Sequence, residues 1–269
     1  IDINAGFLRT ITLEDKISKT KKKIYFYPTQ RALKVAFMLG EVDTAYNLNS
    51  TFVDETDISK WDSVKSTQYT DYSSLLTIFY NNADSVLNNK KVRQALNYAL
   101  SEKVSFGKRA FGPIPPTSFY YELASTYKTS DEELAKTLLS TVEDPIGTLT
   151  ISTPEDYEET AKQIQKDWQK LGIKTAIKIT DGIPSNFQIL LYKVKLPLDP
   201  DQYILWHSAQ ASNIIHYKNL RIDKLLEDGR SITDTEKRKK IYADFQKYLN
   251  DDAPASFYYF PINYTLDKK

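Results

Sequence analysis

The fold is decided by a stretch that runs from an apolar segment through a polar one into a helical pattern: Leu75-Leu76-Thr77-Ile78-Phe79-Tyr80, then Asn81-Asn82-Ala83-Asp84, and then Lys91-Val92-Arg93-Gln94-Ala95-Leu96-Asn97-Tyr98-Ala99-Leu100. The first segment has the length of a strand, and the second predicts a loop. A helix over about residues 89–100 would turn Val92, Leu96 and Ala99 inward. We expect this helix to pack in a core, with Arg93 making a local ion pair.

Strand and helix patterns alternate outward from this stretch. Residues 24–27 and 41–46 have strand character and flank a helical pattern that starts at Thr29, an arrangement that favours a parallel sheet. That helix would place its apolar residues on one face and end at Gly40 in the left-handed conformation. The apolar residues are Ala32, Val35, Ala36 and Leu39.

The second half of the chain continues the alternation. Residues 154–171 form the clearest helical pattern, which Thr153 would cap, and residues 173–179 and 256–260 follow strand patterns. Two capping boxes, at 130–133 and 233–236, predict further helices. The fold class is therefore α/β.

Composition excludes several classes of protein. The chain has 269 residues, a formal charge of +1, no Cys and only two His, His207 and His216. The balanced charge gives no footprint for nucleic acid, and 41% hydrophobic residues argue against disorder. Without Cys there are no disulfides, Cys-ligated metals or thiol nucleophiles. We expect no cofactor and no metal.

The ends of the chain suggest a processed or truncated piece. The sequence opens with Ile1, its only Met is Met38, and no signal peptide precedes residue 11. No apolar run approaches the roughly 18 residues that a membrane-spanning helix needs.

Few residues could support catalysis. The eight glycines do not fall into the spacing of a dinucleotide or phosphate loop, and no Gly-x-Ser-x-Gly elbow occurs. Asp199 and Asp201, on either side of Pro200, could supply carboxylates for acid–base chemistry or bind Ca²⁺, or they could build a surface turn. The two His are interpreted as ordinary polar residues, and an enzyme is not expected.

Four stretches carry a resemblance to a known family. They are residues 32–43, with Gly40-Glu41-Val42-Asp43; Tyr80-Asn81-Asn82 followed by residues 91–100; Gly112-Pro113-Ile114-Pro115-Pro116-Thr117-Ser118; and a series that comprises Asp199-Pro200-Asp201, Trp206, Asn213, Tyr217, residues 222–226, Arg238, Tyr242 and Gln246. In this order, from about residue 24 to 264, they resemble the C-terminal half of the family 5 extracellular solute-binding proteins, which serve ABC importers of oligopeptides, dipeptides and nickel.

The resemblance implies a periplasmic-binding-protein-like fold of the peptide-binding type (class II), with a mixed sheet flanked by helices, as part of a two-lobe protein. Residues 1–75 would form part of the first lobe, 76–255 the second lobe and 256–269 a return to the first, with crossings near 70–80 and 252–262. Members of this family clamp an extended peptide between lobes by a hinge motion and deliver it to permease subunits. The implied protein is a bacterial monomer at the outer face of the cytoplasmic membrane or in the periplasm, and any lipid anchor would lie outside this truncated piece.

One stretch departs from the family pattern. Many peptide-binding members have Trp-x-Ala-Asp-Tyr before Asp-Pro, and the Asp pairs with the α-amino group of the peptide. In this chain Leu196 occupies that position, and Lys193 and Lys195 would repel an ammonium. Our hypothesis is a longer or internally bound peptide, or a peptide whose acidic group faces Lys193 or Lys195.

The resemblance also implies a set of ligand-contacting residues and leaves alternatives open. The expected contacts are Tyr80, Asn81, Ile114, Pro115, Tyr192, Lys193, Val194, Lys195, Asp199, Tyr203 and Trp206. Alternative functions are a sensory or adhesive derivative of the same fold that has lost transport, and a hydrolase that uses Asp199 and Asp201.

Overall fold

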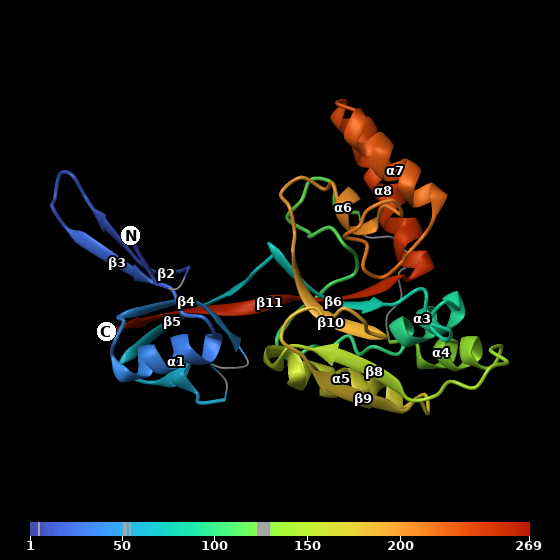
Figure 1. Ribbon diagram of the computed structural model, residues 1–269, viewed down its shortest axis with the longest axis horizontal. Coiled ribbons are helices and arrows are strands. Elements are labelled where there is room, and N and C mark those ends of the chain that lie inside the picture. The colour runs from blue at the N-terminus through green and yellow to red at the C-terminus, as the bar shows by residue number, and fades with distance from the viewer. Residues whose placement is uncertain (5, 51–52, 54, 123–129) are drawn as a thin grey trace. The chain divides into compact units, whose positions relative to one another are not determined.

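The computed structural model describes residues 1–4, 6–50, 53, 55–122 and 130–269. The chain forms two compact units (Figure 1): unit 1 comprises residues 1–69 and 263–269, and unit 2 comprises residues 70–262. The sequence-based boundaries at 75/76 and 255/256 lie six and seven residues from these.

Unit 1 contains two groups of strands. β1 (Asp2–Asn4), β2 (Phe7–Glu14) and β3 (Lys21–Tyr25) form an antiparallel three-stranded sheet. β4 (Thr44–Asn49) pairs antiparallel with the end of β11 (Ala255–Lys268), and η1 (Ile58–Lys60) and β5 (Val64–Thr70) follow β4. The parallel unit expected over residues 24–46 is therefore wrong, because β3 pairs with β2 and β4 with β11.

Helix α1 (Gln30–Leu39) has the predicted ends but a different buried face. Thr29 accepts a hydrogen bond from the Ala32 amide, and Gly40 ends the helix with φ 85°. Phe37 is buried against Leu48 and Leu266, whereas Val35 and Leu39 are exposed. The predicted apolar face is therefore not the buried one: of its residues Ala36 is buried, and Phe37 lies beside it in the core.

The sheet of unit 2 is mixed. Its strand order is β11-β6-β10-β8-β9, and β7 also pairs with β11. β6 is antiparallel to both neighbours, whereas β10, β8 and β9 are parallel. The strand bounds are Ser74–Tyr80 (β6), Gly107–Arg109 (β7), Leu149–Thr153 (β8), Thr175–Ile179 (β9) and Ile189–Lys195 (β10).

Helices cover both faces of this sheet (Figure 1). On one face lie α3 (Lys90–Tyr98), α4 (Glu132–Leu139), η2 (Glu155–Tyr157) and α5 (Glu158–Gln169); on the other lie α6 (Tyr203–Trp206), α7 (Leu220–Ser231) and α8 (Thr235–Asp252). β6 is buried along its whole length because alternate side chains enter two cores. Leu76, Ile78 and Tyr80 join Val92, Leu96 and Trp168, while Leu75 and Phe79 join Trp206, Phe245 and Phe257.

Three caps differ from the sequence-based expectation. Asp131 caps α4 and Asp234 caps α8, each one residue after the predicted Ser130 and Thr233. The 154–171 segment opens with the η2 turn rather than with a helix capped by Thr153. The charged carboxylate of Asp is attracted to the positive N-terminal end of the helix dipole, whereas the neutral hydroxyl of Ser or Thr lacks this attraction.

Arg93 of α3 is buried and acts through backbone hydrogen bonds rather than through the expected ion pair. It donates to the carbonyls of Leu87 (2.8 Å) and Asn88 (3.0 Å), and to those of Asp252 (2.8 Å) and Ala253 (3.0 Å). The side chain thus joins the loop before α3 to the end of α8.

Candidate functional site

Three parallel strands of unit 2 end at one edge of the sheet. β10 runs parallel to β8, and β8 parallel to β9, so their carboxyl ends coincide. β6 runs the opposite way and begins there, with Ser74 opposite Lys195. In α/β proteins, ligands bind outside the carboxyl ends of such strands. We call Asp71, Asp156, Lys193 and Lys195 the carboxyl edge.

Lys195 and Asp71 form one charged pair of this edge. The Lys195 Nζ lies 3.6 Å from an Asp71 carboxylate oxygen and 3.4 Å from the Ser73 hydroxyl. Burial opposes ionisation of Asp71, but hydrogen bonds from Ser73 and the charge of Lys195 outweigh it, so the pKa of Asp71 is lowered. Asp71 is therefore an anion at neutral pH, and it partly neutralises Lys195.

Lys193 is half-buried and has no ion pair with any carboxylate among the residues that the structure describes. Burial, followed by repulsion from Lys195, lowers the pKa of Lys193; Asp71 and Asp156 act in the opposite direction. Burial also raises the pKa of Asp156, which follows β8, and Lys193 counteracts it. An anionic group that reached Lys193 would replace the water lost on burial and relieve the repulsion.

Tyrosines and one more lysine surround the carboxyl edge. Lys108 of β7 lies 5.6 Å from the ring centroid of Tyr72, and the hydroxyl of Tyr72 raises the pKa of Lys108. Tyr192 and Val194 of β10 are half-buried, and burial raises the pKa of Tyr121. Tyrosines of this kind offer apolar surface together with a polar tip.

Two expected contacts lie at the opposite end of the same strands. Tyr80 pairs with Ile189, at the start of β10, and is fully buried; its hydroxyl contacts Ser256 Oγ at 2.8 Å. Asn81 donates to the Phe187 carbonyl at 3.0 Å. The structure places both residues away from Lys195 and gives both a structural role.

The Pro loop and α6 contribute mainly to the core. Ile114 is buried among the residues beneath α6–α8, and Pro115 is half-buried. Trp206 is also buried, and its Nε1 donates to Gln202 at 2.8 Å. Tyr203 is half-buried and stacks on His207, with ring centroids 4.2 Å apart.

Asp199 and Asp201 are each engaged by an arginine. Arg238 donates to both oxygens of Asp199, and Arg230 donates to Asp201 at 2.7 Å. No group of three acidic or His residues that could hold a metal occurs among the described residues. Because both carboxylates are paired, they do not form the two open groups that a hydrolase needs.

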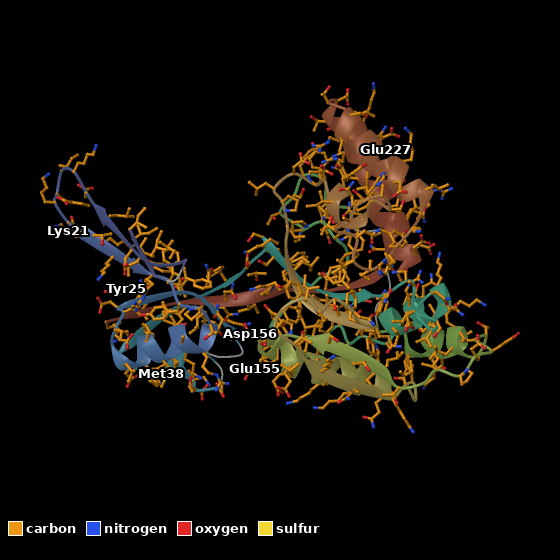
Figure 2. The ribbon with its side chains drawn as sticks, viewed as in Figure 1. Lys21, Tyr25, Met38, Glu155, Asp156 and Glu227 are labelled. Carbon is orange, nitrogen blue, oxygen red and sulfur yellow. The ribbon has the colours of Figure 1, made fainter. Side chains whose placement is uncertain are left out.

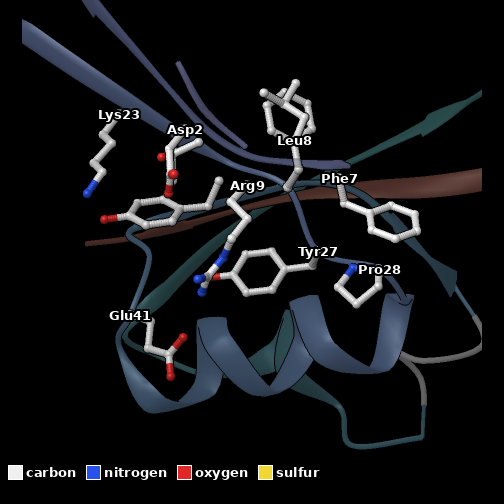
Figure 3. A pocket seen from close by; sticks show the side chains of 11 residues that line it. Asp2, Phe7, Leu8, Arg9, Lys23, Tyr27, Pro28 and Glu41 are labelled. Atoms are coloured by element: carbon white, nitrogen blue, oxygen red, sulfur yellow. The ribbon is translucent and has the colours of Figure 1, made fainter. Parts of the chain in front are cut away.

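A separate concavity lies within unit 1, between the β1–β3 sheet and α1 (Figure 3). It has a volume of about 950 Å³, and the Arg9 side chain extends beside the ring of Tyr27. Burial, then the charge of Glu41, raises the pKa of Tyr27. No expected ligand contact lines this concavity.

The sequence-based set omitted Asp71, Asp156 and Lys108. Asp156 had a partial signal, because it lies in the first turn of the helix predicted over residues 154–171, but the strand before it, β8, was not predicted. Asp71 and Lys108 had none, since their position depends on the order of strands in the sheet.

The fold of unit 2 places this polar edge where α/β proteins commonly bind small solutes. The family described as bacterial extracellular solute-binding proteins, family 5 Middle, matches residues 16–212, and the chain belongs to this family. The family is one of solute-binding proteins and not of enzymes.

Curated relatives support this assignment. The oligopeptide-binding protein AppA of Bacillus subtilis is 28% identical over 228 residues, which cover 71% of this chain and 42% of AppA. Heme-binding protein A of Haemophilus influenzae is 28% identical over 212 residues, which cover 66% of this chain and 37% of that protein. The chain thus spans about two fifths of these relatives.

Solved structures share the fold. The ABC transporter substrate-binding protein CtaP of Listeria monocytogenes has a TM-score of 0.85 at 21% identity, covering all of this chain and 60% of CtaP. AppA from Bacillus subtilis, in complex with a nonapeptide, has a TM-score of 0.79 at 24% identity, covering all of this chain and 61% of AppA. None of the helices within the described residues is long and apolar enough to cross a membrane.

Proposed function

We propose that this chain acts in the substrate-binding component of an ABC-type peptide importer, outside the cytoplasmic membrane or in the periplasm. It binds an extended peptide and delivers it to permease subunits. Family membership supports the transport role, and relatives named for oligopeptides and dipeptides support the ligand class.

Lys193 at the carboxyl edge carries the proposal about the ligand, because it is half-buried and forms no ion pair within the part of the chain that the structure describes. A carboxylate of the peptide, either a side chain or the C-terminus, faces this ammonium. Lys195 takes a smaller part because Asp71 already engages it. An extended peptide adds main-chain hydrogen bonds that depend little on its sequence.

Leu196 bears on the other end of the peptide. Its side chain is half-buried and packs against the core beneath α6–α8, so no carboxylate stands at this position to receive an ammonium. We therefore expect N-acetylated and unblocked peptides to bind alike. A gain for unblocked peptides alone in Leu196→Asp would show that this position can serve an amino group.

Mass spectrometry of the solutes released on denaturing the purified protein tests the peptide class directly. We expect peptides that carry a carboxylate beyond the main chain or a free C-terminus. Recovery of no peptide, together with no calorimetric signal for a peptide library, would instead favour a sensory or adhesive derivative.

A matched pair of variants tests the role of Lys193. Lys193→Met should weaken binding of a recovered peptide by about tenfold, the effect of one charge-assisted hydrogen bond. Lys178→Met removes an exposed lysine from β9 of the same sheet and should leave binding unchanged. Equal affinities of the two variants would refute the contact.

A further inference from the structure

The turn between β2 and β3 in unit 1 is strongly basic. Residues 14–23 contain five lysines and two acidic residues, a net charge of +3, whereas the whole chain has a net charge of +1. The rest of the chain is therefore slightly acidic. We call Lys16, Ile17, Lys19 and Lys21 the basic tip; Lys21 is labelled in Figure 2.

The carboxylate of Asp15 holds the turn in a defined shape. The Asp15 carboxylate accepts hydrogen bonds from the amides of Ile17 (2.8 Å) and Ser18 (2.7 Å), and the Lys19 amide donates to the Asp15 carbonyl at 3.0 Å. These backbone hydrogen bonds lower the pKa of Asp15. The negative charge of Asp15 is thus turned toward the backbone of the loop, while the lysines are exposed.

An exposed apolar side chain, Ile17, lies among the lysines of this turn. Ile17 is 95% exposed, and Leu13, on the adjoining strand, is 52% exposed. Within the described residues no ion pair involves Lys16, Lys19 or Lys21, and all three are exposed. Lys22 differs, since it lies over the ring of Tyr46.

We propose that the basic tip docks on an anionic membrane surface. Lysines next to such a surface are each attracted by its negative potential, and an apolar side chain among them can enter the headgroup region. The lysines attract anionic headgroups. Ile17 gains an apolar contact in the headgroup region, which a soluble polyanion does not offer. The preformed turn reduces the entropy that docking must overcome.

Sedimentation with vesicles tests this docking. The full chain should bind vesicles of phosphatidylcholine with 30% phosphatidylglycerol and should not bind phosphatidylcholine alone. Each lysine contributes roughly fivefold to binding near an anionic surface, so Lys16→Gln, Lys19→Gln and Lys21→Gln together should weaken binding by about a hundredfold. Added salt should weaken wild-type binding steeply.

Two further variants separate charge from shape. A control with Lys166→Gln, Lys218→Gln and Lys240→Gln loses the same charge from exposed positions of unit 2 and should bind like wild type. Ile17→Ser keeps the charge and should weaken binding by about tenfold. Circular dichroism verifies that every variant is folded.

Three results would overturn the docking: equal binding of neutral and anionic vesicles, equal loss in the tip and control variants, or no binding of wild type to either vesicle. The last result, with retention on an immobilised acidic peptide, would assign the tip to a protein partner instead.

Discussion

Arg238 donates two parallel hydrogen bonds to the carboxylate of Asp199, from Nη1 to Oδ2 at 2.8 Å and from Nη2 to Oδ1 at 2.6 Å. Its Nε donates to the Gly229 carbonyl at 2.7 Å, and the guanidinium lies 5.2 Å from the ring centroids of Tyr120 and Tyr242. One side chain therefore joins the segment after β10 to α7 and α8.

Arg238→Lys should lower the free energy of unfolding by about 1–2 kcal/mol, because an ammonium cannot make the bidentate contact or stack on two rings. Urea denaturation measures the change. Arg221→Lys, which alters an arginine over a single ring, Tyr248, is the control and should change stability less. An unchanged urea midpoint for Arg238→Lys would contradict a stabilising role for the bidentate contact between Arg238 and Asp199.

The same contact has a defined pH dependence. Hydrogen bonds from Arg238 lower the pKa of Asp199 below its ordinary value of 3.8. The stabilisation is therefore complete above the unfolded pKa and disappears as pH falls through the folded pKa. The stability difference between wild type and Arg238→Met should be constant above about pH 5 and shrink in more acidic solution. A stability difference between the two proteins that grows as the pH falls would contradict this pH dependence.

Arg93→Met should destabilise unit 2 by about 3 kcal/mol or more, since four backbone carbonyls lose their donor in a buried setting. Arg93→Lys should recover part of the loss, because an ammonium can reach some of these carbonyls. Thermal unfolding of the three proteins measures both effects. Equal stability of the Met and Lys variants would show that packing, and not hydrogen bonding, sets the requirement.

Gly107→Ala should destabilise unit 2 by about 2–3 kcal/mol through overpacking. A Cβ at this position would lie 2.1 Å from Tyr259 Cδ2 and 2.6 Å from the Phe260 carbonyl oxygen, so β7 would have to move away from β11. Gly147→Ala meets open space and serves as the control. Denaturant midpoints that coincide for the two variants would disprove the close approach.

Lys195→Met should raise the pKa of Lys193, because it removes a neighbouring positive charge and releases Asp71. NMR titration of the lysine side chains measures the shift. Lys178→Met should leave the pKa of Lys193 in place. A lowered pKa of Lys193 in Lys195→Met would contradict this prediction, because it would mean that the loss of hydration around Lys193 outweighs the loss of repulsion.

Local patterns were sufficient for the elements whose signal lies within a few residues. β6 and α3 follow from a continuous apolar run and a helical repeat, and Gly40 marks the end of α1. Pairing was misjudged where the partner is distant: β4 pairs with β11, more than 200 residues later, and no local pattern records this.

The candidate site was predictable only in part for the same reason. Lys193 and Lys195 stood out because they depart from a family motif, but Asp71 joins them only because β6 is antiparallel to β10. Tyr80 and Asn81 form part of a recognisable motif, yet they lie at the other end of the strand. A motif can identify a fold through residues that never contact a ligand.

The 14 residues of β11 contribute to both units: residues 255–261 pair with β6 and β7, and residues 263–267 pair with β4. A ribosome therefore releases every partner of β11 before β11 itself emerges, so β4, β6 and β7 cannot pair with it during most of synthesis. Until then the edges of β4 and β6 remain open to other strands. The nascent chain consequently has a long interval of aggregation risk, during which a holding chaperone would be of most use.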